Sequence, residues 1–178
     1  VDKAGWGFLR DDVERLGEYP ALSVLVVEKS RAFDLKVGEA TTEMSGMFLT
    51  RRLGLWGHLE MEHLPKEGLR YWFANESVRS HADASETGGF VRSTVPSFQL
   101  KRDLLDQHVL DLAVAAGAEL VRPARAREIE VGSFDHRVTV DDEAGTATVA
   151  CRWVIDASGR ACVLGRKLGL IERNERHP

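Results

Sequence analysis

The sequence is poor in the residues that would point to several common classes of protein. Cys151 and Cys162 are the only cysteines among 178 residues, so neither a disulfide framework nor a zinc site is indicated. A reduced, cytoplasmic setting is therefore the default expectation. The six histidines are scattered and form no HExxH motif. No apolar run approaches the ~20 residues that span a bilayer, and no signal peptide is recognisable.

Charge of one sign is also lacking. The net charge is −4, and no block of Lys or Arg forms the footprint of a nucleic-acid-binding protein. With 43% hydrophobic and 29% charged residues, the composition is that of a globular protein, and the length suits one domain over residues 1–178. The chain opens with "VDKAGWGF" and stops with "ERNERHP". We expect it to be a fragment of a larger protein.

The first half of the chain predicts a helix followed by a buried strand. Residues 10–17 have the spacing of a short helix that Gly17 ends. The unbroken apolar run "SVLVVE" (23–28) is typical of a strand inside a parallel sheet. A weak helix over 42–55, a strand over 68–75 and a polar loop over 77–90 follow. Trp72 and Phe73, on that strand, are expected in the core.

The second half predicts a long helix and a β-meander. Leu105, Val109, Leu112 and Ala116 fall on one face of a helix over 101–117, and Gly117 supplies its end. A short strand over 118–121 follows. Three further strands are predicted over 124–131, 136–142 and 146–158, the last returning to the main sheet through "WVIDASG". The fold class is therefore mixed α/β.

A complete glycine-rich phosphate loop is also missing. The pattern G-x-G-x-x-G should lie between a first strand and its helix, and here "AGWGF" offers Gly5 and Gly7 with no strand before them. Glu28 nevertheless ends a buried strand about 23 positions after Gly5, where a nucleotide-binding unit places the acidic residue that binds the ribose. The alternative is a strand-end glutamate that faces water.

Three further segments could carry chemistry. Arg102 lies in the first turn of the long helix, where its donors suit phosphate, although a solvated surface arginine is the common alternative. Lys66 precedes an aromatic strand, and partial removal from water there would make its nitrogen chemically usable; the alternative is a turn lysine in water. "CRWVIDASGR" runs from a strand into small residues that let a ligand approach, or into a plain turn.

The order of these segments resembles a known family. "VVEKS", "KVGEATT", "LPKEGLRYWF", "FQLKRDLLDQHVLDLAVAAGAEL" and "WVIDASGR" succeed one another as in the FAD-binding region of flavin-dependent halogenases. More broadly the succession is similar to the aromatic-hydroxylase and geranylgeranyl-reductase group of flavoproteins. The resemblance runs from Ala4 to about Leu170. It implies a Rossmann-like FAD-binding domain that is incomplete at both ends.

The resemblance also implies residue roles. Glu28 would bind the adenosine ribose, the loop from Gly38 to Thr41 would run beside the flavin ring, and Arg102 would contact FAD near its pyrophosphate or ring. Ala126 would offer backbone contacts to adenine, and the segment Asp156 to Gly159 would pack its backbone against the cofactor. The full set of implied cofactor-binding residues is Gly5, Glu28, Lys29, Gly38, Glu39, Ala40, Thr41, Arg102, Ala126, Asp156 and Gly159.

Lys66 matches the lysine that halogenases use, and is the implied catalytic residue. In that chemistry reduced flavin, oxygen and halide give hypohalous acid, which the lysine steers to a small organic substrate. The implied partners are that aromatic or pyrrole-like substrate, halide and a separate flavin reductase, with neither nucleic acid nor membrane. The alternatives are a flavoprotein reductase that saturates prenyl chains and a truncated remnant without catalytic activity.

Overall fold

The computed structural model describes residues 23–36, 39–74, 76–88 and 93–172. The chain divides into two compact units: unit 1 comprises Val1–Phe33 and Gln107–Pro178, and unit 2 comprises Asp34–Asp106. The helix predicted over residues 10–17 and the candidates Gly5 and Gly38 lie outside the described residues. No helix in the described part of the chain is both long enough and apolar enough to span a membrane.

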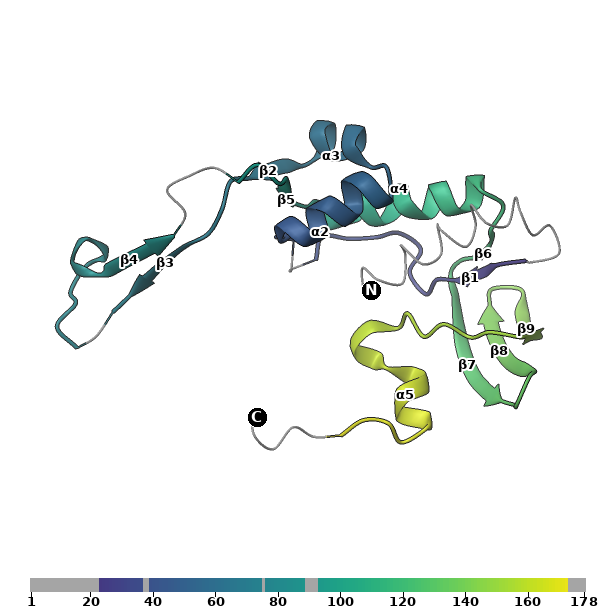
Figure 1. Ribbon diagram of the computed structural model, residues 1–178. Helices are drawn as coiled ribbons and strands as arrows, with labels where there is room; N and C mark the ends of the chain where they lie inside the picture. Colours follow the sequence, from purple (N-terminus) through teal and green to yellow (C-terminus); the bar gives the residue numbers. More distant parts are fainter. Residues whose placement is uncertain (1–22, 37–38, 75, 89–92, 173–178) are drawn as a thin grey trace. The chain divides into compact units, whose positions relative to one another are not determined.

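Unit 1 contains a short parallel pair of strands against the part of the long helix that follows Asp106. Strand β1 (Leu25–Val27) pairs in parallel with β6 (Glu119–Val121), and the chain reaches β6 through α4 (Arg102–Ala115) (Figure 1). Gly117 has φ +102°, a conformation that glycine adopts easily, and there the chain turns from the helix into β6. The predicted strand, helix and strand are confirmed.

The buried face of α4 differs from the predicted one. Ala116 is exposed, whereas Leu110 and Ala113 are buried with Val26 and Ala118 in the core of unit 1. The helix ends at Ala115, so Ala116 lies in the turn that leads to β6. The predicted apolar face therefore extended one residue beyond the end of the helix. Leu110, which was not among the residues of that predicted face, is fully buried.

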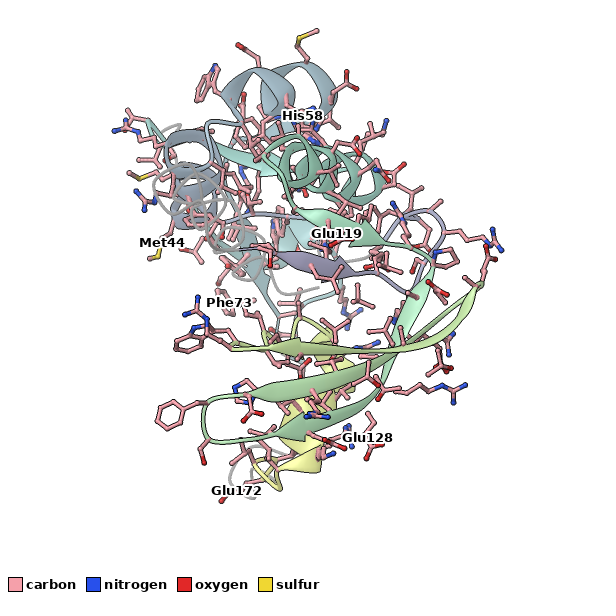
Figure 2. The ribbon with its side chains drawn as sticks, turned by 90° about the vertical axis from the view of Figure 1, so that its right-hand side faces the viewer. Met44, His58, Phe73, Glu119, Glu128 and Glu172 are labelled. Carbon is pink, nitrogen blue, oxygen red and sulfur yellow. The ribbon has the colours of Figure 1, made fainter. Side chains whose placement is uncertain are left out.

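The predicted β-meander is confirmed for its three strands. β7 (Ala124–Val131), β8 (His136–Asp142) and β9 (Gly145–Cys151) form an antiparallel sheet with a bulge between Ala126 and Glu128. Side chains project from both faces of these strands, as Figure 2 shows around Glu128.

The extension of the third strand to residue 158 was wrong. Cys151 pairs with His136, the first residue of β8, so the chain beyond Cys151 has no partner in this ladder. Residues 152–158 form no strand, and they lead into a 3-10 turn, η3 (Gly159–Ala161), and the short helix α5 (Val163–Lys167).

Unit 2 contains a helical segment that confirms the weak helix predicted over residues 42–55. Helix α2 (Glu43–Met47) continues into η1 (Phe48–Arg52), which has π-helical hydrogen bonding, and α3 (Trp56–Glu62) follows. Among the described residues of this unit, the buried hydrophobic side chains are aliphatic except for Phe98. They include Leu49, Leu53, Leu55, Leu59, Phe98, Leu100 and Leu105.

Four short strands lie in the described part of unit 2. β2 (Leu64–Lys66) pairs antiparallel with β5 (Ser97–Gln99), and β3 (Arg70–Phe73) pairs with β4 (Ser85–Gly88), which follows the 3-10 turn η2 (His81–Asp83). The prediction of a polar loop over residues 77–90 was therefore wrong in part, because β4 lies within it. The placement of Trp72 and Phe73 in the core was also wrong. They are 46% and 62% exposed on a ribbon of only two strands (Figure 2 labels Phe73).

Candidate functional site

Strand β5 organises the candidate site of unit 2, because chain segments pair with it along both edges. On one edge, Glu39 O accepts a hydrogen bond from Leu100 N (2.9 Å) and Ala40 forms an isolated bridge with Gln99. On the other edge lies β2, with Lys66 opposite Ser97. The described part of the predicted flavin-side loop is thus held to β5 by backbone hydrogen bonds, and so has a defined path.

Thr41 is the most firmly held residue of this loop. Its side chain is buried, at 1% exposure, and its Oγ1 both donates to Phe98 O (3.0 Å) and accepts from Phe98 N (2.7 Å). Its backbone N–H donates to the same carbonyl (2.9 Å). A buried hydroxyl that is satisfied as both donor and acceptor fixes the local backbone. The Thr41 carbonyl therefore has a defined position.

Lys66 meets that carbonyl. Its ammonium Nζ donates to Thr41 O at 2.7 Å, and its own backbone carbonyl accepts a hydrogen bond from Ser97 Oγ at 2.9 Å. The lysine is half-buried at the end of β2. The alternative of a turn lysine surrounded by water does not match this arrangement. The structure therefore brings together two candidates, Lys66 and Thr41, that lie 25 positions apart in the sequence.

Arg102 is buried and paired. Its Nε and Nη2 donate to Oδ1 and Oδ2 of Asp106, each at 3.0 Å, and the residue is only 7% exposed. The alternative of a solvated arginine is wrong. Lys36 Nζ also lies 3.7 Å from Asp106 Oδ2, so two cations share one carboxylate beside the first turn of α4. The positive end of the α4 dipole favours an anion there, and the first turn also carries the carboxylate of Asp103.

Asp106 was missed by the sequence analysis. Its spacing of four residues from Arg102 on a helix is the signal that could have identified it. The pair uses two of the five N–H donors of the guanidinium.

Buried His63 was also missed, and no sequence pattern marks it. Its Nδ1 accepts a hydrogen bond from Lys101 N at 3.0 Å, at the entrance to α4. Burial, followed by the neighbouring His58, lowers the pKa of His63 below its ordinary value of 6.5; Lys101 acts in the same direction, and Glu62 and Asp103 oppose it. The imidazole is therefore held in its neutral form, with Nδ1 as acceptor.

Glu28 is the central candidate of unit 1. It follows β1 at the carboxyl end of the parallel pair, half-buried, with its N–H donating to Val121 O (3.1 Å) and its carbonyl accepting from Ala124 N (2.8 Å). Its Oε1 accepts from Ser30 N at 2.7 Å. Ligands of open α/β sheets bind outside the carboxyl ends of the strands. A carboxylate fixed there has the chemistry that a ribose needs.

Lys29 and Ala126 lie close to this end of the parallel pair. Both are exposed, and Ala126 lies on β7 at the residue where the bulge begins. Lys29 lines an open cleft with residues around the start of β7 (Pro123, Ala124, Arg125, Arg127) and around the end of β8 (Asp141, Asp142, Glu143).

The segment from Asp156 to Gly159 has a clear structural task. Asp156 accepts from Ser158 N (3.0 Å) and Leu164 N (2.8 Å), and Ser158 Oγ accepts from Val163 N (3.1 Å). Partial burial by itself would raise the pKa of Asp156, but the hydrogen bonds that its carboxylate accepts from Ser158, Leu164 and Gly165 together lower this pKa. Both side chains satisfy N–H groups at the start of α5. Gly159, at φ +61°, occupies the left-handed region. The side chains of Asp156 and Ser158 therefore form the hydrogen bonds of a turn, which matches the alternative of a plain strand-to-turn transition.

No group of three or more His, Cys, Asp or Glu residues in the described part of the chain is arranged to hold a metal ion. The candidates fall into two groups. Glu39, Ala40, Thr41, Lys66 and Arg102 belong to unit 2, whereas Glu28, Lys29, Ala126, Asp156 and Gly159 belong to unit 1.

The parallel pair, the long helix and the β-meander form a mixed α/β fold, and solved structures share it. A flavoprotein/dehydrogenase from Cytophaga hutchinsonii matches with a TM-score of 0.70 at 19% identity, over 96% of this chain and 40% of that one. The halogenase PltM, solved with phloroglucinol and FAD, matches with a TM-score of 0.69 at 21% identity, over 92% of this chain and 33% of that one.

A comparison of sequences finds similarity to a flavin-dependent halogenase. The flavin-dependent halogenase chlA of Dictyostelium discoideum is 26% identical over 162 residues, which cover 81% of this chain and 27% of that protein. No protein-family model matches the chain. The resemblance to the FAD-binding region of flavin-dependent halogenases is confirmed. The chain spans well under half the length of each of these relatives.

Proposed function

We propose that this chain is the FAD-binding part of a flavin-dependent halogenase or related monooxygenase that acts on a small organic substrate, aromatic or pyrrole-like. The observation that carries the proposal is the contact between Lys66 Nζ and Thr41 O, which joins the candidate catalytic lysine to the flavin-side loop. The similarity to the chlA halogenase of Dictyostelium discoideum supports it. Residues 1–178 form one FAD-binding-type domain in this proposal.

The residues present fit FAD. Glu28, at the carboxyl end of the parallel pair, binds the adenosine ribose, with Lys29 beside it. Arg102, at the start of α4, contacts the pyrophosphate or the ring. The remaining contacts come largely from backbone or from small residues, which a flat ring approaches closely. They are Gly5, Gly38, Glu39, Ala40, Thr41, Ala126, Asp156 and Gly159.

The bound flavin supplies the redox chemistry that generates the oxidant from oxygen and halide. The chain contributes Lys66, a half-buried ammonium whose N–H donors not bound to Thr41 O hydrogen-bond and orient the oxidant beside the substrate. One of these donors already binds Thr41 O, so the nitrogen has a fixed resting position. A group held in place before the reaction needs little reorganisation during it. Small-molecule substrate, halide and a separate flavin reductase are the proposed partners.

The test supplies the protein with FAD, a flavin reductase, oxygen and either chloride or bromide, and follows a panel of phenols and pyrroles by mass spectrometry. We expect a product that carries the supplied halogen, and whose isotope pattern changes when the halide is exchanged. A prenyl-chain reductase would instead reduce double bonds without any need for halide. A halide-independent product would refute the halogenase proposal, and failure to bind FAD would refute the cofactor assignment as well.

A further inference from the structure

We infer that Thr41 and Ser97 are positioning residues for Lys66: together they hold its backbone and its ammonium at fixed points on β5. This inference rests on the proposed function, in which Lys66 is the catalytic residue, and it adds two residues that act through it. Both are buried, at 1% and 3% exposure. Neither hydroxyl bonds to the lysine's ammonium, so each acts on it indirectly.

Ser97 holds the backbone end. It lies directly opposite Lys66 in the β2–β5 ladder, and its Oγ donates to Lys66 O at 2.9 Å. The contact ties the last residue of β2 to the first residue of β5, where the chain leaves the ladder for the turn at Glu67 and Gly68. Strand ends fray when their backbone groups lack partners. Ser97 therefore keeps the Cα of Lys66 in place.

Thr41 holds the ammonium end. Its carbonyl accepts from Lys66 Nζ at 2.7 Å, a short bond to a charged donor, which is the stronger kind of hydrogen bond. Three hydrogen bonds to Phe98 fix the residue that carries this carbonyl. Thr41 lies along one edge of β5 and Lys66 along the other, so the lysine side chain reaches across the strand. Movement of either edge would displace the nitrogen.

The next turn of the chain supports Thr41. Thr42 Oγ1 accepts from Ser45 N at 3.4 Å and caps helix α2. This helix lies so close to β5 that a Cβ on Gly46 would come within 1.8 Å of Pro96 O. The segment before the helix is thereby fixed at both ends, because Glu39 and Ala40 also pair with β5.

The test compares Thr41→Val with Thr41→Ser. Valine keeps the shape of threonine but loses the hydroxyl, whereas serine keeps the hydroxyl. Each protein, as the full chain, is treated briefly with an acetylating reagent, and acetylation at each lysine is measured by peptide mass spectrometry. Exposed Lys29 is the internal reference. Lys66 should react up to about tenfold faster relative to Lys29 in the valine variant, because loss of the two Oγ1 hydrogen bonds to Phe98 lets the Thr41 carbonyl move away from the ammonium. Loss of a hydrogen bond to a charged group is commonly worth that factor or more.

Wild-type protection should return in Thr41→Ser, an outcome that a general loss of packing would not produce. Wild-type protection of Lys66 in a folded valine variant would overturn the inference. If circular dichroism shows that the valine variant does not fold, Ser97→Ala takes its place, and unchanged protection of Lys66 in that variant overturns the inference equally.

The labelling needs neither flavin nor halide, so its outcome is separate from that of the proposed function. Release of Lys66 by Thr41→Val, together with a lack of halide-dependent product from the wild-type protein, would refute only the halogenase proposal. Halide-dependent product together with unaltered labelling would refute only the positioning role. Where the protein is active, we expect Thr41→Val to lower the ratio of halogenated product to flavin oxidised, and Thr41→Ser to restore it.

Discussion

Replacement of Gly46 by alanine should weaken the packing of α2 on β5. Gly46 is buried, and a Cβ placed there would lie 1.8 Å from Pro96 O and 2.8 Å from Pro96 C. Real Cβ contacts essentially never fall below 3.0 Å, so the two backbones must separate by about 1.2 Å or more, from 1.8 Å to at least 3.0 Å. The obstacle is backbone, which cannot move aside as a flexible side chain can.

Two opposing effects set the size of the change. Overpacking of this kind costs about 3 kcal/mol. Alanine recovers about 1 kcal/mol through its higher helix propensity. The free energy of unfolding should therefore fall by about 2 kcal/mol, which corresponds to a decrease in Tm of roughly 4–8 °C for a chain of this size.

Gly57→Ala is the matched control. Gly57 also lies in a short helix, α3, but a Cβ there would meet nothing within 4 Å. Only the propensity gain applies, so this variant should be more stable than the wild-type protein by about 1 kcal/mol. Urea unfolding followed by circular dichroism measures both variants. The reasoning is refuted if Gly46→Ala unfolds at the same urea concentration as Gly57→Ala.

Two further predictions concern the core and the pH dependence. Leu110→Ala, at a fully buried position of unit 1, should lower the free energy of unfolding by about 2–5 kcal/mol. Val114→Ala, on the exposed side of α4, is the control and should change it by less than about 0.5 kcal/mol. Urea unfolding measures both variants, and equal losses of stability would contradict the prediction. Because the pKa of His63 is lower in the folded protein than its ordinary 6.5, its neutral form adds stability above pH 6.5 that is lost as the pH falls below it. The wild-type protein should therefore lose stability between about pH 7 and pH 5 more steeply than His63→Gln, and equal slopes would contradict this.

Local pattern was sufficient for the elements with strong periodicity. The strand of Val26, the helix of Leu105 and Val109, and the three meander strands all follow from spacing and from turn residues. Pattern failed where an element depends on its partner. Strand β4 exists because Ser85–Gly88 pairs with β3, and nothing in its polar sequence specifies that pairing. Trp72 is exposed for a related reason, since two strands alone cannot bury an aromatic side chain on both faces.

The candidate site shows the same limit. Lys66 and Thr41 were identified separately through the family resemblance, but the bond between them depends on β5, to which both segments pair. Pairing between segments so far apart is a property of the folded chain, and residue spacing does not encode it. The burial of Arg102 against Asp106 could have been recognised from their i, i+4 spacing. The side chains of Asp156 and Ser158 proved to cap α5, a task that the small residues around them did not reveal.

The most direct test of the account is the comparison of halide-dependent product formation by the wild-type protein and by Lys66→Ala, with bound FAD measured in the same samples by absorbance. The account predicts that Lys66→Ala retains FAD at the wild-type ratio, because Thr41, the proposed FAD contact that Lys66 touches, keeps its three hydrogen bonds to Phe98. It also predicts that halogenated product falls at least about 100-fold, the lower range for a group that acts on the reacting atoms. Halogenation by Lys66→Ala at the wild-type rate, with FAD bound, would contradict the central claim.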